Sequence, residues 1–212
     1  MTVKKQVNSD HYEFKKYVNK NHRWVSYWHQ IDEILDAKAS SVLEVGAGAP
    51  VLKKMISIFS PEISYKILDI AEDLNPDYVG SVTDIPVDAN VFDIVCAFQI
   101  LEHIPYDEFE SGLKELSRVS KKRVLISLPH FGPAIRIFIK IPLLPDIKLA
   151  LKIPYPIKHR WNGEHYWEIG KKNYSPNRIR KDIRKHFVIV KEYIPFENQC
   201  HRFYILEKKS DT

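Results

Sequence analysis

The sequence is poor in cysteine and lacks any long apolar run. Its 212 residues include two cysteines, Cys96 and Cys200, which are too few for a disulfide framework or for a zinc site built from thiolates. No apolar stretch approaches the roughly 18–20 residues of a membrane-spanning helix. The first residues, Met1 to Gln6, also lack the apolar core of a signal peptide. These absences predict a protein of a reducing compartment, and we expect it in the cytoplasm.

The composition is that of an ordinary globular domain with an uneven distribution of charge. Hydrophobic residues make up 44% and charged residues 28% of the chain, a balance that excludes disorder, collagen-like repeats and a coiled coil. Residues 1–120 carry 12 Lys and Arg against 19 Asp and Glu, a formal −7, whereas residues 121–212 carry 20 against 8, a formal +12. The two halves are therefore expected to face different ligands.

Short β-branched or apolar runs alternate with helical patterns along most of the chain. The spacing predicts strands at 41–45, 65–70, 80–84, 92–98 and 123–128, and helices within 10–37 and at 51–59 and 107–119. The run from Phe92 to Phe98 is almost continuously apolar, as expected for a central parallel strand covered on both faces. Two further strands, 187–193 and 202–206, are joined by a short turn and predict an antiparallel edge hairpin. Together these elements indicate an α/β fold with a mostly parallel seven-stranded sheet.

A glycine turn follows the first predicted strand. Gly46 and Gly48 come directly after it, at the carboxyl edge where open parallel sheets bind ligands. Glycine admits a positive φ and close approach of a ligand because it has no Cβ. A dinucleotide-binding fingerprint would need a third glycine at Val51, and a P-loop would need Gly-Lys-Ser/Thr after the turn, so both are disfavoured. The other polar residues at this edge are Glu44, before the glycines, and Asp69, at the end of the next strand. A carboxylate there can accept hydrogen bonds from both hydroxyls of a ribose.

These residues resemble the motifs of class I S-adenosylmethionine-dependent methyltransferases, close to the type 11 group. The first motif, an acid followed by G-x-G, reads Leu43-Glu44-Val45-Gly46-Ala47-Gly48, and the acid that ends the second strand matches Asp69. The third motif matches Asp84-Ile85-Pro86. The fourth matches Phe92-Asp93-Ile94-Val95, with the continuation Phe98-Gln99-Ile100-Leu101-Glu102-His103-Ile104.

The resemblance covers about residues 40–130, with Pro50 standing where many family members have a third glycine. It implies a Rossmann-like three-layer sandwich and S-adenosylmethionine as the cofactor. We treat residues 1–212 as a single methyltransferase domain. Its expected parts are an N-terminal helical cover at 1–39, a donor-binding core at 40–130, a lid or insertion at 131–170, and a C-terminal helix and hairpin at 171–212.

The resemblance also implies which residues bind the methyl donor. It places the methionine end of the donor against Gly46 and Gly48, the ribose hydroxyls on Asp69, and the adenine amino group on Asp84. The full implied set is Glu44, Gly46, Ala47, Gly48, Asp69, Ile70, Asp84, Ile85, Phe98, Gln99 and Leu101. From the residues alone, Glu44 and Asp69 can also be strand-end surface acids, and Asp84 can be a turn residue.

Three histidines are candidates for catalysis. Methyl transfer from a sulfonium is an in-line displacement, for which a protein chiefly supplies alignment and desolvation. A base is optional, and imidazole is the usual side chain for that role near neutral pH. The candidates are His103, His130 and His165, although His103 can equally serve in packing or at a helix start. His165 belongs to an aromatic and acidic cluster at 163–168, which either lines the acceptor pocket or is a packed aromatic anchor. We expect no metal site.

The predicted lid combines apolar residues with cations. The run 131–145 is too apolar to lie exposed in a monomer without a function. The lysines that punctuate the run and its continuation are Lys140, Lys148, Lys152 and Lys158. Residues 131–158 are therefore predicted to contact an anionic, apolar partner such as a lipid-linked acceptor or a membrane surface. The alternative is that this segment folds onto the sheet edge or onto a dimer partner.

The leading hypothesis is an S-adenosylmethionine-dependent methyltransferase that acts on a small, hydrophobic or lipid-linked acceptor. One alternative is an RNA methyltransferase, because residues 178–186 form a basic helix near several aromatic residues. Nucleic acid is disfavoured, since a net charge of +5 is modest and no RNA-binding module is recognisable. The other alternative, motivated by Pro50, is a partner subunit that binds the donor without turnover. The sequence leaves the acceptor atom and the oligomeric state open.

Overall fold

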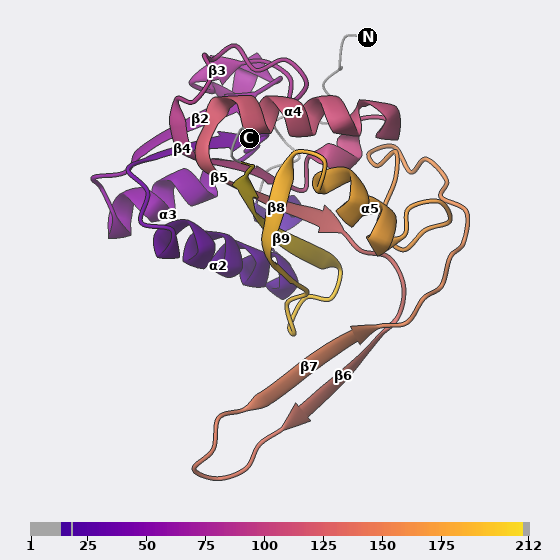
Figure 1. Cartoon of the computed structure of the whole chain (residues 1–212). Helices are drawn as coiled ribbons and strands as arrows, with labels where there is room; N and C mark the ends of the chain where they lie inside the picture. The colour runs from indigo at the N-terminus through magenta and orange to yellow at the C-terminus, as the bar shows by residue number, and fades with distance from the viewer. Residues whose placement is uncertain (1–13, 18, 210–212) are drawn as a thin grey trace.

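Seven strands form one sheet in the computed structural model, which describes residues 14–17 and 19–209 (Figure 1). Their order is β3-β2-β1-β4-β5-β9-β8. The five strands from β3 to β5 are parallel to one another, and β9 is antiparallel to both β5 and β8. The strands are β1 (Ser41–Val45), β2 (Ser64–Asp69), β3 (Tyr78–Val79), β4 (Phe92–Phe98), β5 (Ser120–Pro129), β8 (Phe187–Tyr193) and β9 (His201–Lys208). This confirms the expected fold class, a mostly parallel sheet with an antiparallel C-terminal hairpin.

Helices cover both faces of the sheet because the central strands are apolar on both sides. In β4, Val95 and Ala97 pack into one core, whereas Ile94 and Cys96 pack into the other. The first core also takes the buried faces of α4 and α5, and the second takes those of α2 and α3. The helices are α1 (Phe14–Tyr17), α2 (Asn21–Asp36), α3 (Val51–Phe59), α4 (Phe109–Val119) and α5 (Pro176–Ile183), with short 3-10 turns η2 (Glu72–Leu74), η3 (Leu101–His103) and η4 (Tyr106–Glu108).

The third strand is shorter than predicted and ends earlier. β3 contains only Tyr78 and Val79, and the segment expected to be the strand, residues 80–84, forms a turn. Asp84 N donates to Ser81 O at 3.0 Å, and Ser81 Oγ accepts from Thr83 N at 3.2 Å. Because these local hydrogen bonds replace the sheet ladder, the chain turns away after Val79. The prediction of a strand ending near Asp84 is therefore wrong.

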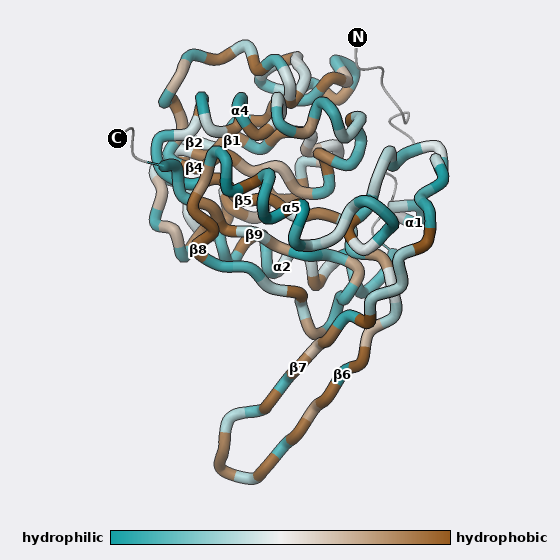
Figure 2. The backbone as a smooth tube through the Cα atoms, turned by 45° about the vertical axis from the view of Figure 1, so that its right-hand side comes forward, coloured by the Kyte–Doolittle hydropathy of each residue, from teal (hydrophilic) through white to brown (hydrophobic). Residues whose placement is uncertain are grey.

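The lid segment contains a two-stranded hairpin that the sequence analysis did not predict. β6 (Ala134–Ile139) pairs antiparallel with β7 (Ile147–Lys152), and neither strand joins the main sheet. The hairpin projects away from the body of the molecule and is mostly apolar (Figure 1 and Figure 2). Arg136 is the one polar residue of β6, and Lys148 and Lys152 are those of β7. Among the helices that the structure describes, none has the length and apolar character needed to cross a membrane.

Trp167 anchors the end of the lid segment to the core. Its side chain is fully buried, and its indole Nε1 donates to Ile104 O at 3.2 Å. The rings of Tyr106 and Phe109 each lie 5.0 Å from the indole in edge-on contacts. Within the 163–168 cluster, Trp167 is therefore a packed aromatic anchor and does not line an acceptor pocket.

We predict that Trp167→Ala lowers the free energy of unfolding by about 3–5 kcal/mol, because it removes a fully buried indole and leaves a cavity. The matched control is Trp161→Ala, whose side chain is 52% exposed and whose loss should cost less than about 1 kcal/mol. Urea unfolding followed by circular dichroism measures both. Equal losses for the two variants would contradict the anchoring role of Trp167.

Candidate functional site

A cavity of about 360 Å³ lies where the carboxyl ends of β1, β2 and β4 meet. Parallel strands end at the same edge of a sheet, so this edge collects side chains that are distant in sequence. The cavity size is within the usual range for small-molecule sites. Its lining comes from five regions: the α1–α2 region, the turn after β1, the end of β2, the segment 80–82, and the segment after β4, completed by Glu164, His165 and His201. We call this space the donor cavity.

The turn after β1 requires glycine for steric reasons. Gly46 has a φ of +70°, and a Cβ at this position would lie 2.1 Å from Ile100 Cδ1. Gly46 N donates to Leu68 O at 2.7 Å, which holds the turn against the end of β2. Gly48 also has a positive φ of +57°. The backbone is thus exposed to the cavity at Gly46 in a conformation that other residues rarely adopt.

Two buried acids stand beside this turn. The carboxylate of Asp69 accepts hydrogen bonds from Gly48 N at 3.1 Å and from Ala71 N at 2.9 Å, which fixes it at the cavity wall. Glu44 accepts a hydrogen bond from the Tyr65 hydroxyl at 3.0 Å, and burial raises the pKa of Glu44 to about 8. Neither acid is a surface residue, so the alternative of strand-end surface acids does not hold for Glu44 or Asp69.

Most of the implied donor-binding residues line the donor cavity. Those that do are Glu44, Gly46, Ala47, Asp69, Ile70, Phe98 and Gln99. Gln99 has a φ of +58°, unusual for a residue other than glycine, and its Nε2 donates to Ser127 Oγ at 3.1 Å. Strained backbone of this kind is often found at functional sites.

Four implied residues lie outside the lining of the donor cavity. Gly48 borders a neighbouring pocket with Pro50. Ile85 and Leu101 are buried in the hydrophobic core, and Asp84 is exposed on the turn after β3. Asp84 is thus the turn residue that the alternative reading described. Gly80, Ser81, Val82 and Ile100 form the walls that we had assigned to Asp84, Ile85 and Leu101.

The N-terminal helices contribute a wall of the cavity, and its α2 residues were not named in the sequence analysis. Tyr17, Arg23, Ser26, Tyr27 and Gln30 all line the donor cavity. The last four follow helical spacing along one face of α2, and the guanidinium of Arg23 lies 3.8 Å from the centre of the Tyr17 ring. The available signal was the set of polar residues on the inward face of an amphipathic helix, at steps of three, one and three residues.

The structure brings together two of the three candidate histidines. His103 and His165 both line the donor cavity, with ring centres 5.1 Å apart. His130 lies outside it, with Nδ1 accepting from Arg202 Nε at 3.1 Å; burial and the Arg202 charge lower the pKa of His130 to about 3. A further histidine that we did not predict, His201, lines the cavity and shares a 2.8 Å hydrogen bond with Ser26 Oγ.

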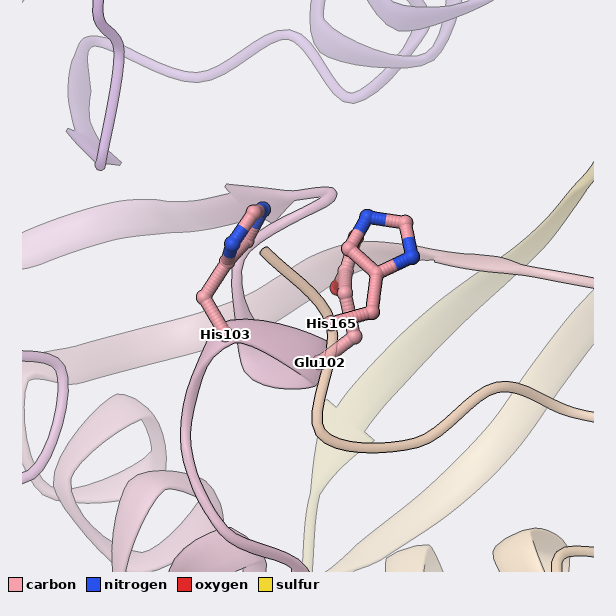
Figure 3. A group of neighbouring side chains, drawn as sticks. All are labelled: Glu102, His103 and His165. Atoms are coloured by element: carbon pink, nitrogen blue, oxygen red, sulfur yellow. The ribbon is translucent and has the colours of Figure 1, made fainter. Parts of the chain in front are cut away.

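The two cavity histidines differ in protonation. Burial lowers the pKa of His103 to about 4, so its imidazole is neutral near pH 7. Burial also disfavours the cationic form of His165, but the hydrogen bond to Glu168 and the nearby Glu102 carboxylate outweigh it and raise the pKa of His165. Next to them, burial raises the pKa of Glu102 to about 8. Figure 3 shows Glu102 and His103 projecting from one turn, with His165 on a separate loop beside them.

Comparison with known proteins places this site in a family. Residues 43–128 match the model of the family described as a methyltransferase domain. No curated protein matches the sequence. The solved structures that share the fold include the following three. The PH0226 protein from Pyrococcus horikoshii is 13% identical, with a TM-score of 0.57, and the match covers 96% of this chain and 100% of that chain.

The second is an S-adenosylmethionine-dependent methyltransferase from Clostridium acetobutylicum, 8% identical over 93% of this chain and 96% of that chain, with a TM-score of 0.57. The third is the 1,6-didemethyltoxoflavin-N1-methyltransferase from Burkholderia thailandensis, 15% identical over 95% of this chain and 85% of that chain, with a TM-score of 0.55. The matched segment contains both the glycine turn and Asp69. Residues 43–128 therefore match a methyltransferase domain, and the chain shares its fold with solved structures that include an S-adenosylmethionine-dependent methyltransferase.

Proposed function

We propose that this methyltransferase binds S-adenosylmethionine in the donor cavity and transfers the methyl group in line to a small, hydrophobic or lipid-linked acceptor. The observation that carries the donor part is the convergence of Gly46 and Asp69 on one cavity. Each carboxylate oxygen of Asp69 accepts one backbone N–H and keeps a further lone pair for a ribose hydroxyl. The bare backbone at Gly46 admits the methionine end.

With these two contacts assigned, the remaining parts of the donor are assigned to the other walls of the cavity. Phe98 and Gln99 face the cavity from the end of β4, opposite the α2 wall. Ser81 and Val82 offer the surface for the adenine ring, the role that the resemblance gives to Asp84 and Ile85. Of the three candidate bases, we assign the acceptor contact to His103 and His165; what supports this is that both line the cavity and His130 does not. A buried, partly apolar site of this kind supplies the alignment and desolvation that methyl transfer needs.

The Asp69 contact gives a direct test of the donor site. We predict that Asp69→Ala weakens binding of S-adenosylmethionine and S-adenosylhomocysteine by at least about tenfold, because two hydrogen bonds to a carboxylate are lost. Isothermal titration calorimetry measures both ligands. Asp88→Ala, at an exposed acid of the same charge, should leave the affinity unchanged. Unchanged affinity in Asp69→Ala would remove the basis of the donor assignment.

The acceptor part of the proposal depends on the β6–β7 hairpin. One of its faces consists of three aliphatic cross-strand pairs. They are Ile135 with Leu151, Ile137 with Leu149, and Ile139 with Ile147. All six side chains are between 41% and 54% exposed. A continuous aliphatic face of this kind is typical of an interaction surface.

The other face of the hairpin carries the cations and turns toward the body. Lys148 Nζ donates to Glu197 Oε1 at 2.9 Å, and the Phe138 ring lies 6.3 Å from the Phe196 ring. The alternation of side chains along a strand then directs the aliphatic face away from the body. Exposed Ile141, Leu143 and Leu144 extend this surface to the hairpin tip.

We propose that the hairpin lies in the interfacial layer of an anionic bilayer and brings the cavity to a lipid-linked acceptor. The narrow projecting shape and apolar tip suit insertion between headgroups (Figure 2). The formal +12 of residues 121–212 adds attraction to anionic lipid. A small-molecule acceptor is also supported by two methyltransferases of similar fold, the 1,6-didemethyltoxoflavin-N1-methyltransferase and the magnesium protoporphyrin IX methyltransferase from Synechocystis.

The RNA alternative receives less support. Two of the five Lys and Arg residues in the basic segment 178–186 are paired with acids: Arg180 with Glu192 at 2.7 Å and Lys185 with Glu110 at 2.7 Å. Such compensated charges give a weak field for a phosphate backbone.

The tip leucines test the membrane contact. We predict that the double variant Leu143→Ser/Leu144→Ser partitions at least about tenfold more weakly onto vesicles of phosphatidylglycerol and phosphatidylcholine, because two apolar side chains no longer enter the interface. Vesicle flotation measures the partition. Val188→Ser/Val190→Ser is the matched control, since both valines are exposed on β8 away from the hairpin.

Two results would overturn the lipid version. One is equal partition of the wild-type protein and the tip variant. The other is a concentration-dependent dimer in analytical ultracentrifugation that only the tip variant loses, because the aliphatic face then belongs to a second copy of the chain.

A further inference from the structure

Three side chains of types that can bind a metal ion lie close together, and two of them, His103 and His165, line the donor cavity. Glu102 and His103 come from η3, directly after β4, and His165 comes from the loop at 163–168 (Figure 3). One ligand atom from each residue lies within 4.8 Å of the other two. Ligands held at about 2.0–2.2 Å from one ion lie about 3–4 Å apart, so a small contraction brings the three onto a common centre.

The Glu102 carboxylate is the strongest sign that this group holds a ligand. The residue is fully buried, and neither of its side-chain oxygens has a hydrogen-bond partner among the described residues. A buried carboxyl group without a partner is unfavourable, and buried polar groups are normally satisfied. A cation beside Glu102 removes this cost by supplying both charge and coordination.

The two histidines are held in the orientation that a metal ion requires. His165 Nδ1 is 3.1 Å from Glu168 Oε1, and His103 Nδ1 is 3.0 Å from the backbone oxygen of Glu164. When Nδ1–H of His165 donates to Glu168, the lone pair of that neutral ring is on Nε2, and the ring of His103 is also held by the backbone of Gln99. A carboxylate or carbonyl behind each imidazole is the usual support of a metal-binding histidine.

We propose that Glu102, His103 and His165 bind one divalent transition-metal ion, such as Zn²⁺, Mn²⁺ or Co²⁺, at the acceptor side of the donor cavity. Two imidazoles and one carboxylate are a ligand set that suits these ions and leaves coordination positions open. Because both histidines line the cavity, the open positions face it. This site differs from our sequence-based expectation of no metal.

The open positions assign a chemical class to the acceptor, an inference that rests on the proposed methyltransferase function. The ion takes an acceptor hydroxyl oxygen and lowers its pKa, and the hydroxyl proton leaves to solvent. That oxygen forms the new bond to the methyl carbon, the carbon–sulfur bond breaks with its electron pair on sulfur, and S-adenosylhomocysteine results. An acceptor with a hydroxyl, or two adjacent hydroxyls that chelate the ion, is therefore favoured.

Metal titration of tag-free protein tests the site without any acceptor. Co²⁺ is added while its visible absorption is recorded, and Zn²⁺ is then used to displace it. We expect one ion per chain, with affinity lowered at least tenfold in Glu102→Gln and in His165→Gln. Glu168→Gln keeps all three ligands and should lower affinity about 10–100-fold, since it removes only the carboxylate behind His165.

His201→Gln is the control, because His201 lines the same cavity outside the cluster and its loss should leave Co²⁺ affinity unchanged. Glu102→Gln preserves side-chain volume and replaces a buried ionisable group by a neutral one, so it should fold. Wild-type protein that binds Co²⁺ no more tightly than Glu102→Gln overturns the metal site. Calorimetric titration of the same samples with S-adenosylhomocysteine separates the two proposals. If the wild-type protein binds S-adenosylhomocysteine but not Co²⁺, the metal site alone is rejected. If the wild-type protein does not bind S-adenosylhomocysteine, the proposed function is rejected.

Discussion

The close approach of the Gly46 turn to the end of β4 is the constraint on which the rest of the site depends. A side chain at Gly46 would overlap Ile100, and the hydrogen bond from Gly46 N to Leu68 O ties the same turn to β2. Gln99 takes a left-handed conformation on the β4 side. The ends of β1, β2 and β4 are thus held close together around the cavity. The position of the cavity therefore follows mainly from the backbone conformation at these strand ends.

Burial then determines the electrostatic character of this volume. Glu44 and Glu102 have pKa values raised to about 8, while His103 has its pKa lowered to about 4, each mainly through desolvation. Near pH 7 burial therefore favours the neutral forms of these three groups. A sulfonium donor loses its positive charge in the transfer step, so a site that excludes water suits the reaction. A cation at Glu102 fits the same environment, since it provides the partner that the buried carboxylate lacks.

Local patterns in the sequence predicted most of the fold. The strand at 92–98 and the helix at 51–59 match β4 and α3 in their bounds, because continuous apolar runs and helical spacing are strong local signals. The prediction of a strand at 80–84 was wrong because the side chain of Ser81 takes a backbone hydrogen bond that a sheet partner would otherwise accept. The hairpin at 134–152 was missed because its strands pair only with each other, and nothing in one strand alone specifies its partner.

The site was predictable where it follows one strand end and less so where it joins distant segments. Glu44, Gly46 and Asp69 were found from motifs, whereas the α2 wall and His201 needed the tertiary arrangement. The central claim is that the cavity between β1, β2, β4 and α2 holds the methyl donor. A crystal structure of the complex with S-adenosylhomocysteine tests it most directly. The account predicts that ligand in this cavity with its ribose hydroxyls on the Asp69 carboxylate. Density for the ligand in the neighbouring pocket at Gly48 and Pro50, or away from Asp69, would contradict it.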